Sequence, residues 1–258
     1  MGYWQDRMAN AQTKISNKSI RAIETQMRKY YASTMKKVIK DFEATYDKLL
    51  ATVDDGREPT PADLYKLDKY WELQAQARRE LERLGARQIA LLSKEFELNW
   101  FEIYHSISLP GSPSFNTIDK QAVQQMINQI WVADGKSWSQ RIWQNNNALL
   151  ETLNDGLIHI VGSGKKNTEL KKILQERFNV SYSRADALVR TEVAHIQTQA
   201  AKQRYEDYGV QEVEIWADAD ERRCEVCGEL HQKKYPVGAS VPIPAHPRCR
   251  CCIVPVVE

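Results

Sequence analysis

The chain has 258 residues, of which 42% are hydrophobic and 27% are charged, and its formal net charge at pH 7 is +2. This length suits one large domain or two modest ones. The sequence contains no uninterrupted apolar run long enough to read as a membrane span, and so small a net charge does not by itself indicate a nucleic-acid-binding protein.

The charge is nevertheless unevenly distributed along the chain. Residues 1–50 carry ten lysines and arginines against five acidic residues, a net of +5 that leaves −3 for the remainder. A basic helix can follow a phosphate backbone, but a solvated charged face is the commoner explanation of such a pattern. We therefore expect, at most, a non-specific DNA contact through the basic residues of 1–50.

The N-terminal part predicts two long helices. Residues 3–53 contain no proline or glycine, and their apolar side chains recur every three or four positions, as in an amphipathic helix. After Asp54-Asp55-Gly56, the sequence Thr60-Pro61-Ala62-Asp63 matches a capping box, which begins a second helix that we expect to continue to Ser108. A short connection between two such helices predicts an antiparallel hairpin.

Residues 109–116 hold two prolines and a glycine, which predicts a linker. The expected fold is therefore mainly α: a long helical hairpin at 1–108, a linker at 109–116, and a compact helical domain at 117–258. That domain is expected to end in a small β segment with a zinc-knuckle-like Cys/His site at 213–258. Its expected elements are helices from Asn116 to about Val132, from Ser137 to Gly162, from Asn167 or Thr168 to near Phe178 and from Ser183 to Gly209, and a strand at Val213–Trp216.

All five cysteines lie in the last 35 residues, which also contain His231 and His246. Cys224 and Cys227 form a C-x-x-C pair, and His246 with Cys249 forms a second pair, so the two together could surround one tetrahedral zinc ion. Cys251 is a further potential ligand, which leaves the second pair open among His246, Cys249 and Cys251. We favour Cys224, Cys227, His246 and Cys249 as the ligands.

Disulfides and free thiols are the alternatives to a metal site. An odd number of cysteines and the lack of a signal-peptide pattern favour a reduced, cytosolic chain. A structural zinc is expected rather than a catalytic one, because a catalytic zinc keeps one position open and here the ligands outnumber the positions. Cys252 should point away from Cys251 in an extended segment and pack in the core.

Other motifs do not support a catalytic site. Glu192 and His195 have the spacing that di-iron bundles use in pairs, but the pair occurs once, so we expect structural contacts for it. Glycines at 162 and 164 precede Lys165, but His159 and Lys166 depart from the phosphate-loop pattern. The sequence also lacks the His-Glu-x-x-His and Gly-x-Ser-x-Gly motifs of proteases and hydrolases.

The order of several motifs resembles that of tailed-phage head morphogenesis proteins. These motifs are Trp138-Ser139-Gln140-Arg141-Ile142-Trp143, Arg190-Thr191-Glu192, the stretch from Tyr205 to Gly209, the stretch from Trp216 to Asp220, Cys224-x-x-Cys227, and His246-Pro247-x-Cys249-Arg250-Cys251. Residues 117–258 resemble the minor head protein family typified by phage Mu, whose Cys/His pattern maps onto Cys224, Cys227, His246, Cys249 and Cys251.

The resemblance implies a structural minor capsid protein that acts in procapsid assembly at the portal vertex and, in some members, binds DNA or leaves with it at ejection. Its implied partners are the portal protein and the major capsid or scaffolding protein, and its implied location is the head interior or portal vertex of the virion, with the host cytoplasm during assembly. No catalytic residue carries over. The alternatives are a zinc-dependent nuclease or hydrolase using His246, His231 or Glu192, and a non-specific DNA-binding module.

Overall fold

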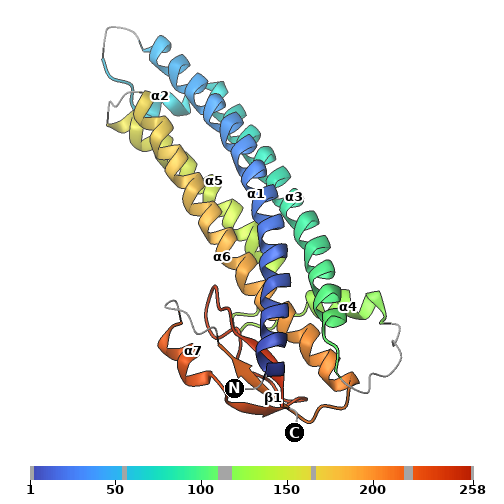
Figure 1. Cartoon of the computed structure of the whole chain (residues 1–258). Coiled ribbons are helices and arrows are strands. Elements are labelled where there is room, and N and C mark those ends of the chain that lie inside the picture. The colour runs from blue at the N-terminus through green and yellow to red at the C-terminus, as the bar shows by residue number, and fades with distance from the viewer. Residues whose placement is uncertain (1–2, 54–56, 110–117, 164–166, 218–222, 257–258) are drawn as a thin grey trace. The chain divides into compact units, whose positions relative to one another are not determined.

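The computed structural model describes residues 3–53, 57–109, 118–163, 167–217 and 223–256. Helices make up 74% of the structure, which confirms the expected mainly α class (Figure 1). The elements in chain order are α1 (Tyr3–Thr52), α2 (Pro61–Tyr65), α3 (Asp68–Ser106), α4 (Lys120–Ile127), α5 (Trp138–Gly162), α6 (Asn167–Asp207), β1 (Glu212–Trp216), α7 (Glu225–Leu230), β2 (Lys234–Pro236) and β3 (Cys252–Pro255).

The helices α1 and α3 run antiparallel, as the hairpin prediction requires (Figure 1). Lys37 pairs with Glu80, whereas Lys18, nearer the start of α1, pairs with Glu102, nearer the end of α3. Buried side chains recur along both helices at steps of three and four residues, which is the pattern of amphipathic helices that pack along their apolar faces.

The predicted capping box at Thr60 is present, but the helix that it begins is short. The Thr60 side chain accepts a hydrogen bond from the Asp63 amide, and Asp63 accepts one from the Thr60 amide. The helix α2 ends at Tyr65, so the single helix expected as far as Ser108 was wrong at this point. Asp68 lies in the first turn of α3, where a carboxylate stabilises a new helix N-terminus.

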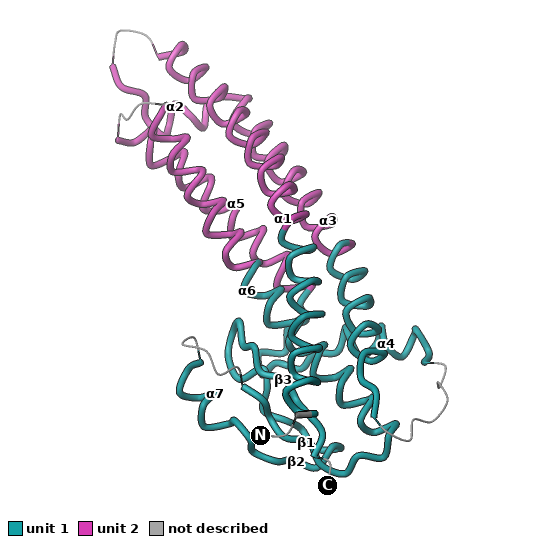
Figure 2. The backbone as a smooth tube through the Cα atoms, in the orientation of Figure 1, with its two compact units in different colours: residues 1–24, 91–138, 186–258 teal, residues 25–90, 139–185 magenta. Residues whose placement is uncertain are grey.

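The chain divides into two compact units, which are not consecutive in sequence (Figure 2). Unit 1 comprises residues 1–24, 91–138 and 186–258, and unit 2 comprises residues 25–90 and 139–185. Both units therefore combine residues from before and after the expected linker at 109–116. Most of that linker lies outside the described residues. The expected division of the chain into functional domains at 1–108 and 117–258 stays a prediction.

Unit 2 consists of segments of α1, α3, α5 and α6 together with α2, and its interior contains a polar layer. The Asn145 amide donates to the carbonyl of Ser181 at 2.9 Å and to its hydroxyl at 3.0 Å. The hydroxyl of Tyr31 lies 3.2 Å from the Ser181 hydroxyl, and Gln88 accepts from Asn146 at 3.1 Å. Such bonds satisfy polar groups that would otherwise be costly to bury.

The helix α6 is continuous where two helices were expected. It runs without interruption from Asn167 to Asp207, so the predicted end near Phe178 and the predicted cap at Ser183 were wrong. The serines and asparagine around residue 180 have weak helix propensity, but Phe178 and Ser181 are both buried. Their packing within unit 2 therefore overrides the local preference.

The remaining helix predictions hold with shifted boundaries. Helix α5 begins at Trp138 and ends at Gly162, close to the expected limits. Helix α4 is shorter than the predicted segment 116–132, because Asp119 caps its start and Asn128 caps its end. The predicted cap at Asn116 lies outside the described residues. No described helix has the length and apolar content that a membrane crossing requires.

Unit 1 contains a three-stranded antiparallel sheet with the order β2-β1-β3. The predicted strand at 213–216 is confirmed as β1, which follows Gly209, a residue with φ of +70° at the end of α6. Strand β1 pairs with β3 so that Ile215 lies opposite Ile253. The side chain of Gln12 in α1 donates to the carbonyl of Ile253 at 2.9 Å, which anchors the sheet to the helices of unit 1.

Candidate metal centre

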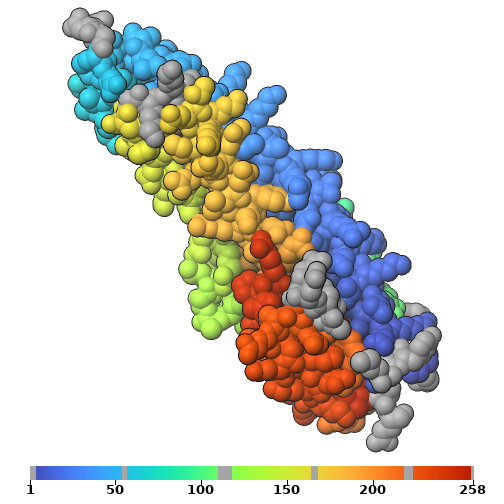
Figure 3. All heavy atoms as spheres, turned by 60° about the vertical axis from the view of Figure 1, so that its left-hand side comes forward, coloured from blue at the N-terminus to red at the C-terminus, as the bar shows by residue number. Residues whose placement is uncertain are grey.

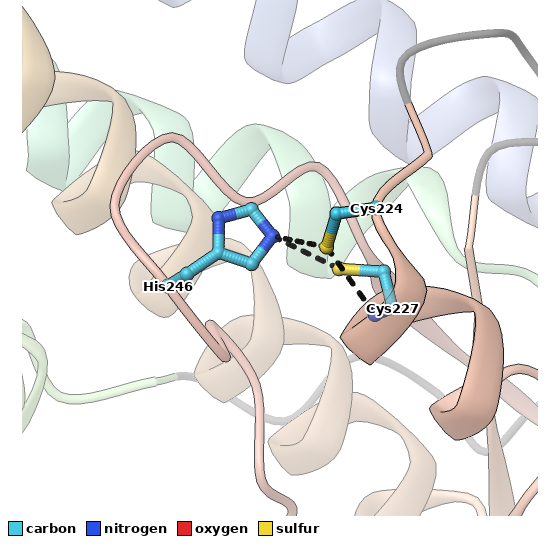
Figure 4. A group of neighbouring side chains, drawn as sticks. All are labelled: Cys224, Cys227 and His246. Carbon is cyan, nitrogen blue, oxygen red and sulfur yellow. Dashed lines mark hydrogen bonds between the residues drawn. The ribbon is translucent and has the colours of Figure 1, made fainter.

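The C-x-x-C pair lies at the start of α7. Cys224 is the N-cap residue of this helix, and its Sγ accepts a hydrogen bond from the Cys227 amide at 3.4 Å. This geometry turns both sulfur atoms toward the same side of the first helical turn (Figure 4). A helix N-cap normally uses an oxygen acceptor, so a cysteine here indicates that the sulfur serves another purpose as well.

His246 approaches this pair from the loop before β3. Its Nε2 lies 3.2 Å from Cys224 Sγ and 3.0 Å from Cys227 Sγ (Figure 4). Its other ring nitrogen, Nδ1, lies 2.9 Å from the carbonyl oxygen of Pro247. A backbone carbonyl in this position holds the ring orientation of metal-binding histidines.

A second group of sulfur atoms adjoins the first. The Sγ atoms of Cys227 and Cys249 are 3.8 Å apart, and Cys251 completes a group of three in which all sulfur atoms lie within 4.8 Å of one another. Cys227 belongs to both groups, so the structure brings together all five residues that the sequence singled out. Cys252 is separate: it is buried on β3, as expected, with its Sγ 3.8 Å from the carbonyl oxygen of Trp216.

The donor atoms are of the types that a tetrahedral metal ion takes, and they form two triads that share Cys227. Two sulfur ligands at about 2.3 Å from zinc stand about 3.8 Å apart in tetrahedral geometry, which matches the distance between Cys227 and Cys249. Thiolates and imidazole are the ligands that structural zinc prefers. The cluster can therefore bind a metal ion, and the Pro247 carbonyl and the Cys227 amide already orient His246 and Cys224.

The protonation of the thiols differs from one to the next. A hydrogen bond from the Cys251 thiol lowers the pKa of Cys249 to about 5, whereas burial raises the pKa of Cys227 to about 12. The amide of Cys227 lowers the pKa of Cys224. Cys249 thus favours the thiolate form more strongly than Cys227 does, and a bound cation would favour the thiolate form of each ligand.

The loop that carries His246 and Cys249 is attached to α6 through Arg248. This residue has a φ of +63°, which is uncommon for an arginine. Its amide donates to Thr191 Oγ1 at 3.0 Å, and its guanidinium lies 3.3 Å from a carboxylate oxygen of Asp186. Sequence reasoning missed these supporting residues, although the Arg190-Thr191-Glu192 motif marked their location.

Glu192, His195 and His231 have structural contacts. Glu192 is buried and accepts a hydrogen bond from the Trp131 indole at 3.0 Å, and His195 stacks on the same indole at 4.2 Å between ring centres. His231 accepts from the Ala217 amide at 3.2 Å and contacts Trp216 edge to face. These contacts agree with the structural interpretation of the Glu192 and His195 spacing.

One family model matches part of the chain. A sequence model described as "Phage Mu protein F like protein" matches residues 151–254, which include the second half of α5 from Glu151, all of α6, β1 and β2, β3 up to Val254, and all five potential ligands. No curated protein and no solved structure matches the chain. The resemblance to the phage minor head protein family is therefore confirmed: residues 151–254 form a Phage Mu protein F-like segment.

Proposed function

We propose that this chain is a structural minor head protein of a tailed phage or prophage and acts in procapsid assembly at the portal vertex. The observation that carries the proposal is the match of residues 151–254 to the Phage Mu protein F-like family. The matched segment contains the whole Cys/His cluster, so the family match and the candidate metal ligands lie in the same part of the chain. On this proposal the protein is present in the host cytoplasm during assembly and in the head interior or portal vertex of the virion.

The metal in this proposal is one structural zinc ion. Its ligands are Cys224, Cys227, His246 and Cys249, because Cys227 contacts both His246 and Cys249, and Cys224 contacts His246 as well. Cys251 then lies beside the ligands and supports the Cys249 thiolate by a hydrogen bond. Four protein ligands leave no position for substrate or water, so we propose a structural and non-enzymatic role rather than that of a hydrolase or nuclease.

The partners in this proposal are the portal protein and the major capsid or scaffolding protein, contacted through residues 1–108. This segment carries exposed large hydrophobic side chains, namely Trp4, Leu50, Tyr65, Trp71 and Leu98. Exposed aromatic and aliphatic side chains favour protein interfaces. A non-specific contact with packaged DNA, during packaging or ejection, would use exposed basic residues of α1 such as Lys14 and Arg28.

Assembly of heads from the genes that surround the coding sequence tests this proposal. Particles are assembled with the wild-type chain, without it, or with the Cys224→Ser/Cys227→Ser variant, and their protein composition is measured. The proposal predicts that the wild-type chain is incorporated in few copies together with the portal protein and that the variant is lost from the particles. Cys252→Ser, which alters a buried cysteine outside the cluster, is the matched control.

Two outcomes would contradict the proposal. One is a normal yield of heads whose composition never includes this chain. The other is a metal that is released freely while the fold persists and whose removal abolishes hydrolysis of nucleic acid, because that result would indicate an open catalytic site.

A further inference from the structure

A basic face runs along α1 and α3 within unit 2 (Figure 2). Residues 25–40 of α1 contain five lysines and arginines and no acidic residue, and residues 78–87 of α3 contain four arginines and two glutamates. The helix α1 lies at the surface, and its side chains project outward from it, as the blue part of Figure 3 shows. The basic face consists of exposed cations of both helices: Lys29, Lys36, Lys37 and Lys40 of α1, and Arg79, Arg83 and Arg87 of α3.

Contacts between the two helices place these cations on one surface. Glu80 Oε1 lies 2.5 Å from Lys37 Nζ of α1 and 2.6 Å from Arg83 Nη1 of its own helix. The guanidinium of Arg87 lies over the ring of Tyr30 of α1, at 6.0 Å from its centre. The lysines of α1 and the arginines of α3 therefore form a single positive surface, which the sequence pattern of either helix alone does not reveal.

Little of the positive charge on the basic face is neutralised by ion pairs. Lys37 and Arg83 share the carboxylate of Glu80, and they are the two cations of the face that have an ion pair among the described residues. Arg79, Arg83 and Arg87 follow one another at intervals of four residues, which is about 6 Å along the helix. Such a row of cations favours a ligand that carries regularly repeated negative charges.

The composition of the basic face indicates a phosphate backbone rather than an acidic protein surface. Protein interfaces are enriched in aromatic side chains and depleted in lysine, and none of the exposed large hydrophobic side chains of the described residues lies in 25–40 or 78–87. Single-stranded nucleic acids stack their bases on aromatic rings, but Tyr30 is half-buried beneath Arg87. Lysines and arginines without exposed aromatic rings suit the phosphates of a duplex, whose contacts carry no sequence information.

We propose that the basic face binds the phosphate backbone of double-stranded DNA without sequence specificity. The arginines of α3 extend the contact beyond the basic residues of α1. The inference rests on the proposed function in one respect, because it supplies a surface for the DNA contact named there. Binding of DNA by the purified chain and incorporation of the chain into heads are separate measurements, so a failure of one is distinguishable from a failure of the other.

Fluorescence anisotropy of a labelled DNA duplex, titrated with the purified full chain at several salt concentrations, tests the proposal. Two double variants remove cations from the face: Lys36→Gln with Lys40→Gln on α1, and Arg79→Gln with Arg87→Gln on α3. Each is expected to weaken binding about tenfold at about 0.1 M salt. Each should also reduce the slope of log affinity against log salt concentration by about 2, or about one per lost phosphate contact.

Lys171→Gln with Lys172→Gln is the matched control, because it removes the same charge from exposed positions on α6 of the same unit. It should leave both the affinity and the salt slope unchanged. Weakening by this control as strong as that by the face variants would reduce the interaction to attraction by net charge and overturn the proposal. Unchanged binding in both face variants would place the DNA elsewhere. Helical circular dichroism identical to wild type establishes that each variant is folded.

Two competitors of equal charge test the choice of ligand. A single-stranded oligonucleotide and polyglutamate are each expected to displace the labelled duplex less effectively than unlabelled duplex does. A single strand that binds more tightly than the duplex, and loses affinity in the face variants, would overturn the duplex assignment. Polyglutamate that displaces the duplex as well as unlabelled DNA does would make the face a docking surface for an acidic protein.

Discussion

The Cys/His segment of unit 1 and the helices of unit 2 obtain their stability in different ways. The segment from Glu212 to Val256 has three short strands and one short helix, and four of its buried side chains are cysteines. Unit 2 has long helices with continuous apolar faces and the polar layer around Asn145. Short elements gain little from their own hydrogen bonds, so we expect the proposed metal to add stability to the segment, whereas unit 2 is stabilised by packing.

Removal of the metal is expected to have the largest effect and to separate the two regions. Structural zinc contributes on the order of 10 kcal/mol to the folding of small sites, so chelation or Cys224→Ala with Cys227→Ala should loosen residues 213–258. The helices of residues 1–108 should persist, because apolar packing holds them. Limited proteolysis with mass spectrometry measures the protease resistance of both regions. Equal resistance of residues 213–258 in variant and wild type would show that the cysteine pair does not stabilise this segment.

The titration of His195 should produce the next largest effect, in unit 1. Burial lowers the pKa of His195 from 6.5 to about 4, so between these values the unfolded chain binds more protons than the folded one. Stability is therefore full above about pH 6.5 and falls as the pH drops toward 4, by up to about 3 kcal/mol.

His195→Phe keeps the ring that stacks on Trp131 but removes the titrating group. Thermal denaturation across this pH range should show a wild-type stability that falls relative to that of the variant as the pH is lowered. Parallel curves would mean that His195 is accessible enough to titrate normally in the folded chain.

A substitution at Gly85 should destabilise unit 2 alone. A Cβ at this position would lie 2.6 Å from a ring carbon of Trp143 and 2.9 Å from the Asn146 amide nitrogen. Gly85→Val should cost about 2 kcal/mol, a typical effect of overpacking, and lower the melting temperature with metal content unchanged. Ala86→Val, at the exposed neighbouring position, is the matched control. Equal effects of the two changes would indicate that helix propensity, not close approach, matters at Gly85.

The polar layer of unit 2 should contribute a smaller amount. Ser181→Ala removes a hydroxyl that lies within hydrogen-bonding distance of Tyr31 and Asn145, and we expect a loss of about 1 kcal/mol. Chemical denaturation measures this loss. Thr152→Ala provides a control, since the Thr152 hydroxyl bonds only locally, to the carbonyl of Leu149 in the same helix. A smaller loss at Ser181 than at Thr152 would mean that the layer adds no stability.

Local signals in the sequence determined much of the helical architecture and the composition of the Cys/His cluster. An unbroken apolar period identified α1, the capping box at Thr60 marked the start of α2, and Gly162 marked the end of α5, because neighbouring residues alone create these signals. Spacing likewise identified Cys224, Cys227, His246, Cys249 and Cys251, since two ligands within three or four residues of each other face a common ion.

Only the tertiary structure decided features that depend on residues far apart in the sequence. Burial of Ser181 against Tyr31 keeps α6 continuous through residues with weak helix propensity, and unit 1 combines the segments 1–24 and 186–258, which the sequence separates by more than a hundred residues. The positive φ of Arg248 is held by Thr191, which lies 57 positions earlier. Periodicity describes one element at a time, whereas these contacts arise only when two elements meet.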